Sequence, residues 1–239
     1  MIVYPNEWKR NYSSCADVET DFVHIIENLL EDVLCEIDVF NLSYSGGIDS
    51  TIMLSVLQRI YSGVHTYTIA SREDHPDILF ARIGSEHYNT IHHEFIVEPN
   101  SKDTDKFNGD NVVRQFFENI KNDVEEIICC DGIDEFMCGY YDHMNMLPET
   151  YEFYLSRLYP DHLVPLNKNS AGVDVYLPYL DDSLINVYKQ IPLFRKVSKS
   201  ERKIVMKELG RKLRIPNEII DRNKYGFCDA FLTKNKGAI

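Results

Sequence analysis

Short apolar runs alternate with amphipathic segments along the first half of the chain. Residues 18–36 carry apolar side chains every three or four positions, which predicts an amphipathic helix before the first strand. Further apolar and β-branched runs predict strands at residues 37–44, 64–70, 91–97 and 126–130, with helices between them at 51–61, 76–88 and 111–123. This alternation favours an α/β fold with a parallel sheet and right-handed crossovers.

The pattern changes after residue 141, where helices are predicted without strands between them. These helices span residues 149–159, 182–190 and 200–213, and a short turn follows Pro216. They indicate a helical layer over the edge of the sheet. We therefore expect an N-terminal extension and helix at residues 1–36, an α/β core at 37–145 and a helical C-terminal part at 146–239.

The composition is typical of a compact globular protein. The chain has 239 residues, of which 44% are hydrophobic, so it can bury a sizeable core. No apolar run approaches the roughly 20 residues that a membrane helix needs, and residues 1–7 lack a basic region followed by an apolar stretch. We therefore expect a cytoplasmic protein that does not enter a membrane. The six cysteines lack a metal-binding spacing, so neither disulfides nor structural zinc are expected.

The charge of the chain is acidic but unevenly distributed. A formal net charge of −13 opposes nonspecific binding to nucleic acid or anionic lipid. Residues 195–224 nevertheless hold eleven Lys and Arg against four Asp and Glu, a local charge of +7. This excess is either the solvated face of a helix or a set of cations directed at a bound polyphosphate.

A serine- and glycine-rich turn, Ser45-Gly46-Gly47-Ile48-Asp49-Ser50, joins the first predicted strand to the next helix. Such a turn points backbone N–H groups and the positive end of the helix at one spot, which suits phosphate oxygens. The glycines allow close approach to an oxyanion, Asp49 can hold a metal ion, and the serines supply hydroxyl donors. No lysine follows, so the turn differs from the G-x-x-x-x-G-K-S/T phosphate loop.

The turn resembles the pyrophosphatase loop of PP-loop enzymes, which cleave ATP between its α- and β-phosphates. Three later segments resemble motifs of one branch, the asparagine synthetase family, to which β-lactam synthetase and lasso-peptide cyclases belong. They are D-G-I-D-E with G-Y at residues 131–140, G-V-D-V-Y-L-P-Y-L-D at 172–181, and I-P-x-x-I-x-x-R-x-K-x-G-F at 215–227. Four ordered motifs cover most of the chain and resemble the synthetase domain alone. The resemblance implies a parallel five-stranded sheet of the adenine-nucleotide α-hydrolase type, with helices on both faces.

The resemblance also assigns roles to individual positions. It implies a nucleotide site formed by Tyr44, Ser45, Gly46, Gly47, Asp49, Ser50, Ile69, Cys129, Cys130 and Lys203. Asp49 and Asp134 are expected to hold a Mg²⁺ ion that bridges the β- and γ-phosphates of ATP. Lys203 is expected to place a positive charge beside the α-phosphate and the departing pyrophosphate. Asp131, which stands where the family has glutamate, is assigned to proton removal from the amine, with a structural hydrogen bond as the alternative.

Other positions carry weaker signals. Arg222 and Lys224 are candidates for phosphate contact or, alternatively, surface cations. His92 and His93 resemble an H-H-E segment of the family, but the alternation of a strand sends the two rings to opposite faces. They are therefore not adjacent metal ligands, and one of them is expected to pack or hydrogen-bond near the site.

The implied activity is that of an ATP-dependent, AMP-forming amide ligase. A carboxylate, by default aspartate, attacks the α-phosphate to form an acyl-adenylate, which ammonia or another amine then converts to an amide. Ile2 stands where the family's glutaminase domain has its nucleophilic cysteine, and about 36 residues precede the first predicted strand. We therefore expect the nitrogen to come from free ammonia, another amine or a separate glutaminase subunit.

Two alternatives stay open at this point. One is a PP-loop enzyme that modifies a nucleic-acid base, although the acidic charge and the last two motifs argue against nucleic acid as a partner. The other is a non-catalytic nucleotide-binding descendant, supported by departures from the family pattern at Cys129, Cys130, Cys138 and Tyr176. Retention of both metal-site aspartates and of Lys203 favours the enzyme.

Overall fold

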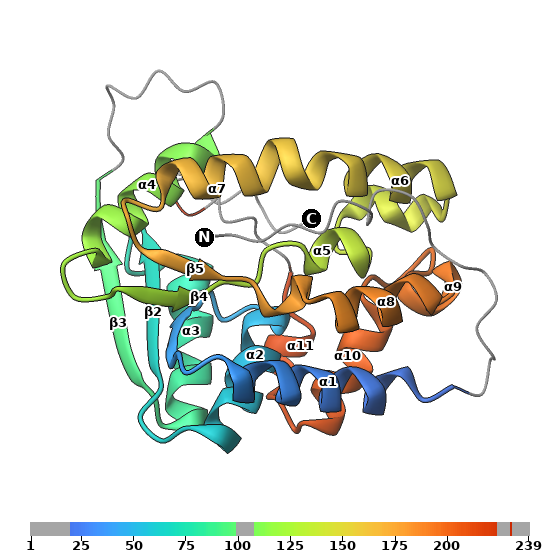
Figure 1. Cartoon of the computed structure of the whole chain (residues 1–239), viewed down its shortest axis with the longest axis horizontal. Coiled ribbons are helices and arrows are strands. Elements are labelled where there is room, and N and C mark those ends of the chain that lie inside the picture. The colour runs from blue at the N-terminus through green and yellow to red at the C-terminus, as the bar shows by residue number, and fades with distance from the viewer. Residues whose placement is uncertain (1–19, 99–107, 224–229, 231–239) are drawn as a thin grey trace.

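The computed structural model describes residues 20–98, 108–223 and 230. Five parallel strands form one sheet in the order β3-β2-β1-β4-β5 (Figure 1). Their bounds are β1 Asn41–Ser43, β2 His65–Ala70, β3 Ile91–Ile96, β4 Glu126–Ile128 and β5 Asp174–Tyr176. Leu42 of β1 pairs with Thr66 of β2 on one side and with Ile128 of β4 on the other, so β1 is central. The predicted α/β class with a five-stranded parallel sheet is confirmed.

Helices cover both faces of this sheet, as predicted. On one face, α2 (Ile48–Ile60) and α3 (Pro76–Tyr88) pack against the strands, and α1 (Phe22–Glu36), α8 (Asp182–Gln190) and α10 (Ile204–Lys212) form an outer layer. The other face is covered by α4 (Asn108–Ile120) and α7 (Val164–Asn169). Neighbouring residues of β4 show the division, since Ile128 belongs to the first core cluster and Ile127 to the second.

Shorter helices complete the described chain. They are α5 (Ile133–Phe136), α6 (Pro148–Arg157), α9 (Leu193–Lys196) and α11 (Asn217–Ile220). Two 3₁₀ turns, η1 (Tyr141–Asn145) and η3 (Pro178–Leu180), and one π-helical turn, η2 (Leu158–Leu163), lie between them. Because η2 joins α6 directly to α7, the three run as one long helix across the top of Figure 1.

Sequence signals at the helix ends explain several boundaries. In α1, Ile26 and Leu30 lie four residues apart on the buried face, and Asp21 caps the start by accepting a 3.0 Å hydrogen bond from a backbone N–H. In α3, Pro76 occupies the first turn, where its missing N–H costs nothing, and Asn89 ends the helix in the left-handed conformation with φ 50°. The predicted helix at residues 76–88 therefore has the observed bounds.

Several other predicted elements were wrong in extent. No strand was predicted after residue 141, yet β5 completes the sheet; it has three residues, of which Val175 alone is buried, so it carries no readable alternation. The strand predicted at 37–44 is reduced to β1. The helix predicted at 51–61 begins at Ile48, and that predicted at 200–213 begins at Ile204, because Lys203 has a left-handed backbone with φ 55°.

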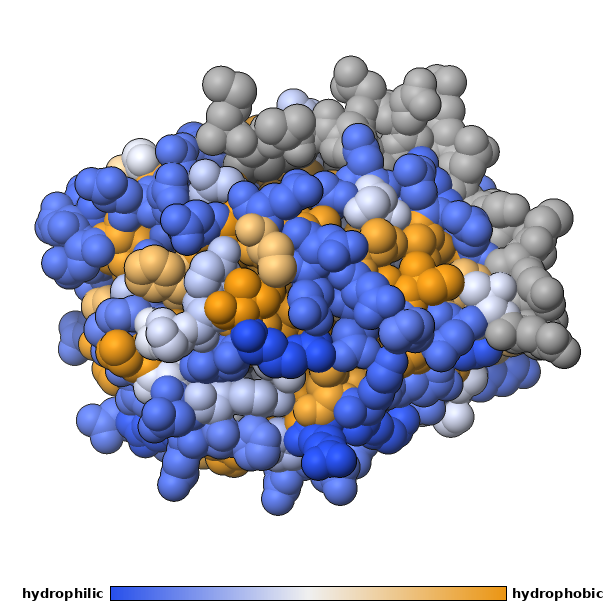
Figure 2. Space-filling model, turned by 60° about the horizontal axis from the view of Figure 1, so that its bottom comes forward, coloured by the Kyte–Doolittle hydropathy of each residue, from blue (hydrophilic) through white to orange (hydrophobic). Residues whose placement is uncertain are grey.

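The surface is mixed in character. Orange apolar residues in Figure 2 lie in several patches separated by blue polar residues, an ordinary arrangement for a folded domain. Within the described ranges, no helix combines the length and apolar character that crossing a membrane requires. Of the closing motif, Lys224, Gly226 and Phe227 lie outside the described residues.

Candidate active site

The glycine turn is held tightly against helix α3. Gly46 has φ 65°, and a Cβ there would lie 2.3 Å from the backbone nitrogen of Ala81, so both its conformation and its surroundings require glycine. Gly47 caps α2, and its carbonyl accepts hydrogen bonds from the hydroxyls of Ser50 at 3.1 Å and Thr51 at 2.8 Å. The first N–H groups of α2 therefore form a fixed cluster of donors at the end of β1.

Arg222 holds the same turn through contacts with Ser45 and with Asp77 at the start of α3. Its guanidinium donates to the carbonyl of Ser45 at 2.9 Å and to Asp77 at 2.5 Å, and it lies 4.7 Å from the centre of the Phe80 ring. Its side chain is 5% exposed, so the alternative of a surface cation was wrong. Arg222 ties the turn to the start of α3.

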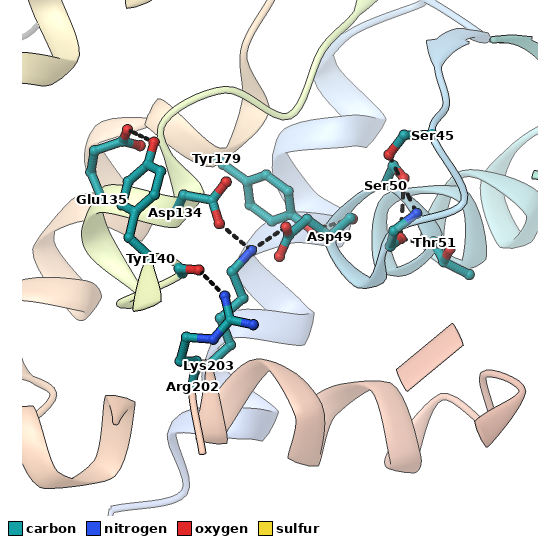
Figure 3. Close-up of polar contacts among 12 residues, drawn as sticks. Ser45, Asp49, Ser50, Thr51, Asp134, Glu135, Tyr140, Tyr179, Arg202 and Lys203 are labelled. Atoms are coloured by element: carbon teal, nitrogen blue, oxygen red, sulfur yellow. Dashed lines mark hydrogen bonds and ion pairs between the residues drawn. The ribbon is translucent and has the colours of Figure 1, made fainter. Parts of the chain in front are cut away.

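The two predicted metal-binding aspartates meet at one lysine. Asp49 lies in the first turn of α2 and Asp134 in the first turn of α5, and the ammonium of Lys203 sits between them (Figure 3). Lys203 Nζ lies 2.5 Å from Asp134 Oδ1 and forms an ion pair with Asp49 Oδ2. Burial lowers the pKa of Lys203, but the neighbouring Asp134 and Asp49 outweigh that effect and raise the pKa above its ordinary value.

Three further groups fix this triad. A Cβ on Gly139 would lie 1.8 Å from Asp134 Oδ1, so glycine is needed for the carboxylate to reach the lysine. Arg202 donates to the carbonyl of Gly139 at 2.5 Å. The hydroxyl of Tyr179, which is fully buried, donates to the backbone carbonyl of Asp49 at 2.8 Å. The side chains drawn in Figure 3 thus tie α2, α5 and the start of α10 together.

The carboxylate pair fits a divalent cation of the Mg²⁺ type. Asp49 Oδ1 is buried and has no hydrogen-bond partner among the described residues, which leaves a hard oxygen ligand to be satisfied. No cluster of three or more ligating His, Cys, Asp or Glu side chains occurs in the described ranges. Two protein carboxylates leave further coordination positions for water and phosphate oxygens, the usual arrangement for Mg²⁺ at a nucleotide.

A cavity of about 600 Å³ opens beside the triad. The predicted site residues on its wall are Ser45, Gly47, Asp49, Ser50, Cys129, Cys130, Asp131, Asp134 and Lys203. The rest of the wall is aromatic and aliphatic where α4 and α7 contribute Phe116, Phe117 and Leu166. A polar end with clustered donors and an apolar end of this size suit the phosphates and the base of a nucleotide.

Three predicted nucleotide-binding residues lie off the wall formed by the described residues. The side chain of Tyr44 is buried, with its hydroxyl 3.1 Å from that of Thr51. Gly46 faces α3, as described above. Ile69 is buried in the core cluster beneath α4, where its side chain has no contact with the cavity. The sequence motif identified the loop but not which way each residue of it points.

A model of the asparagine synthase family matches residues 42–103 and 142–238, together more than half of the chain. The chain belongs to the asparagine synthase family. Residues 104–141, which carry Asp131 and Asp134, lie outside both matched stretches. The departures from the family pattern at residues 129, 130 and 138 fall in that interval.

Individual relatives agree with the family assignment. The chain is 24% identical over 245 residues to glutamine-hydrolyzing asparagine synthetase 1 of Lotus japonicus, covering 86% of this chain and 41% of that protein. It is 26% identical over 216 residues to the glutamine-hydrolyzing asparagine synthetase of Homo sapiens, covering 77% and 38%. The chain thus spans about two fifths of the length of these relatives. A structure of NMN synthetase from Francisella tularensis has the same fold, with a TM-score of 0.51 at 14% identity, covering 90% of this chain and 78% of that one.

The four residues that depart from the family pattern have different surroundings. Burial raises the pKa of the Cys129 and Cys130 thiols, so both are neutral groups on the cavity wall. Cys138 has φ 59°, a left-handed conformation that glycine adopts more easily, and its side chain is fully buried. The hydroxyl of Tyr176 donates a hydrogen bond to Oε1 of Glu126 at 3.4 Å.

The two histidines of β3 face opposite sides of the sheet. His92 lies 2.8 Å from the hydroxyl of Thr66, and burial lowers its pKa. His93 hydrogen-bonds His65 at 3.0 Å and stacks on Tyr67 with ring centroids 4.6 Å apart. Both are bonded within the sheet, which agrees with a packing role.

Three more residues line the cavity, of which Tyr140 closes the second motif, Lys207 follows Lys203 in the basic segment, and His162 belongs to no motif. Tyr140 and His162 lie on the wall near Asp131, and Lys207 lies there with an ion pair to Glu201 at 3.2 Å. Burial raises the pKa of Asp131, the charge of His162 lowers it, and Asp134 raises it again. The signal that could have found His162 is the pair of prolines around it, at positions 160 and 165, which disturb the helix there.

Proposed function

We propose that the chain is an ATP-dependent, AMP-forming amide ligase. The observation that carries this proposal is the convergence of Asp49, Asp134 and Lys203 beside the open start of α2. Two carboxylates for a magnesium ion, a buried cation and a cluster of backbone donors are the groups that phosphate activation needs. Membership of the asparagine synthase family supports the same reaction class.

In the first half-reaction, the chain positions the triphosphate of ATP. The N–H groups at the start of α2 bind phosphate oxygens, and Asp49 and Asp134 would hold a Mg²⁺ ion, which would supply positive charge to the phosphates. An oxygen of the substrate carboxylate attacks the α-phosphorus, and the bond between the α-phosphorus and the bridging oxygen breaks, releasing pyrophosphate. Lys203 stabilises the negative charge that develops on the departing pyrophosphate.

In the second half-reaction, an amine attacks the acyl carbon of the adenylate. The new C–N bond forms, the bond to AMP breaks with its electron pair leaving on the phosphate oxygen, and Asp131 accepts a proton from the nitrogen. A raised pKa makes Asp131 a better proton acceptor than an ordinary aspartate. By analogy with the relatives, the default substrates are aspartate and ammonia, with ammonia free in solution or supplied by a separate glutaminase subunit.

The test is carboxylate-dependent exchange of labelled pyrophosphate into ATP, measured with a panel of carboxylic acids including aspartate. Exchange reports formation of the acyl-adenylate without requiring an amine. Asp49→Asn and Lys203→Ala are expected to abolish exchange, since the first removes a metal ligand and the second removes the positive charge beside the phosphates. Asp182→Asn, an exposed carboxylate in the first turn of α8, and Lys168→Ala, an exposed lysine on α7, are the matched controls and should exchange normally.

Three results would contradict the proposal. Unchanged exchange in both site variants means that the site is assigned wrongly. ATP binding without exchange under any carboxylate indicates a non-catalytic nucleotide-binding protein. Pyrophosphate release that is stimulated by RNA and not by carboxylates indicates a base-modifying enzyme.

A further inference from the structure

The long helix over the cavity changes its winding next to Asp131. Between α6 and α7 it forms the π-helical turn η2, which contains Pro160 and is followed by Pro165. Neither proline has an N–H to donate, so the backbone ladder of a regular helix is interrupted at both positions. The resulting turn places Asp161 and His162 on the cavity wall. π-helical turns of this kind often occur where a helix carries functional side chains.

His162 points at a fixed carboxylate. Its Nε2 lies 3.7 Å from Oε1 of Glu135, and the same oxygen accepts a 2.6 Å hydrogen bond from the hydroxyl of Tyr140. The side chain of Glu135 is 2% exposed, whereas that of His162 is 36% exposed. His162 therefore spans the distance between a buried acidic group and solvent, which suits a group that carries protons out of the cavity.

The positively charged side chains of the cavity wall already have interaction partners within the protein. Each Lys and Arg on the wall has a partner within the described residues: Lys203 with Asp49 and Asp134, Lys207 with Glu201, Arg222 with Asp77, and Arg202 with the carbonyl of Gly139. Six aspartates line the same wall, at positions 49, 110, 131, 134, 161 and 221, together with Glu201, so its acidic side chains outnumber its four cations. This balance favours a positively charged ligand near Asp131 and His162, such as ammonium or a primary ammonium group.

We propose that His162 is the proton-transfer residue of the second half-reaction, and that the acyl acceptor enters this end of the cavity as an ammonium ion. This inference rests on the ligase function proposed above. Asp131 removes one proton from the ammonium and passes it to Nε2 of His162, which releases it to solvent, and the neutral amine then attacks the acyl carbon of the adenylate. AMP leaves with the electron pair of the broken bond, and Asp131 accepts the second proton from the nitrogen and passes it to solvent by the same route.

The charged and titratable groups that face His162 come from several elements. Glu135 belongs to α5, Asp131 lies between β4 and α5, and Tyr140 precedes η1. On its own helix, Asp161 is paired with Arg157 at 2.5 Å.

The experiment separates the two half-reactions in the full chain, with His162→Gln as the variant and His87→Gln, an exposed histidine of α3, as the matched control. Carboxylate-dependent pyrophosphate exchange is expected within about twofold of the wild type in both proteins. Amide formation from ammonia is expected to fall by about 10²-fold or more in His162→Gln, the usual effect of removing a general acid–base group. With hydroxylamine, which is uncharged at neutral pH, the rate of product formation should fall much less in His162→Gln than it does with ammonia.

Each other outcome has a definite meaning. Amide formation by His162→Gln at the wild-type rate overturns the inference and leaves the ligase proposal intact. Equal loss of exchange and of amide formation also overturns it, because a proton-transfer residue of the second step is not required in the first. Absence of exchange in the wild type itself removes the ligase proposal and this inference together.

Discussion

A buried lysine outside the active site gives the most quantitative prediction. Lys196 is 1% exposed, at the end of α9, and its Nζ donates to the hydroxyl of Tyr151 at 2.8 Å. Burial lowers its pKa from 10.5 to about 7, and the nearby Cys138 opposes this only weakly. The folded state therefore binds a proton at this site less readily than the unfolded chain does.

The sign of the pH dependence follows from that difference. Between about pH 7 and 10.5 the unfolded chain holds the Lys196 proton and the folded protein does not, so the free energy of unfolding rises with pH by up to about 1.4 kcal/mol per unit. Below about pH 7 both states are protonated, and the full cost of the buried charge, up to about 5 kcal/mol, destabilises the fold.

Lys196→Met should remove this cost while filling the same space. Tyr151 keeps a hydrogen bond to the carbonyl of Phe136 at 3.3 Å, so the substitution does not leave the hydroxyl without a partner. The variant is expected to be more stable than the wild type at about pH 6, with the difference shrinking toward zero as the pH approaches 10.5. Urea unfolding followed by circular dichroism across this range measures the difference, with exposed Lys168→Met as control. Parallel stability curves for the variant and the wild type would refute the reasoning.

Three further substitutions test other parts of the structure. Gly139→Ala places a Cβ 1.8 Å from Asp134 Oδ1 and should reduce pyrophosphate exchange strongly, which a normal rate in the folded variant would contradict. Gly210→Ala in α10 meets its nearest neighbour at an ordinary 3.5 Å and should raise the free energy of unfolding by about 1 kcal/mol, so a lower thermal midpoint counts against the packing described there. Arg222→Met removes the ion pair between Arg222 and the buried carboxylate of Asp77 and should cost about 3 to 5 kcal/mol in urea unfolding; a loss below about 1 kcal/mol would show that this ion pair is not needed for stability.

Local signals made part of the fold predictable from sequence. The helix at residues 76–88 was bounded correctly because Pro76 and Asn89 mark its ends through their own backbone preferences. The glycine turn was found because all of its features are contiguous. The fifth strand was missed because its three residues pair with β4 through the backbone and leave almost no apolar pattern. The proposed division into an extension, a core and a C-terminal part stays a prediction.

The site was predictable only where its residues belong to short contiguous motifs. Asp49, Asp134 and Lys203 were named from motifs, but no motif displays the ion pairs that join Lys203 to two aspartates far away in the chain. The side chain of Ile69 faces the core, because neighbouring strands and α4 decide which face is buried, and the contact with the nucleotide expected through its backbone stays a prediction. His162 gave no motif at all, since its role depends on a helix being wound differently over a cavity that the sequence does not display.

The most direct test of the shared metal and phosphate site is a crystal structure of the protein with Mn²⁺ and a non-hydrolysable ATP analogue. Anomalous scattering locates the metal independently of the protein density. We expect the manganese peak bound by Asp49 and Asp134 together, with the triphosphate at the start of α2 and Lys203 Nζ on a phosphate oxygen. A metal that contacts neither carboxylate, or a nucleotide bound away from the glycine turn, would contradict the account.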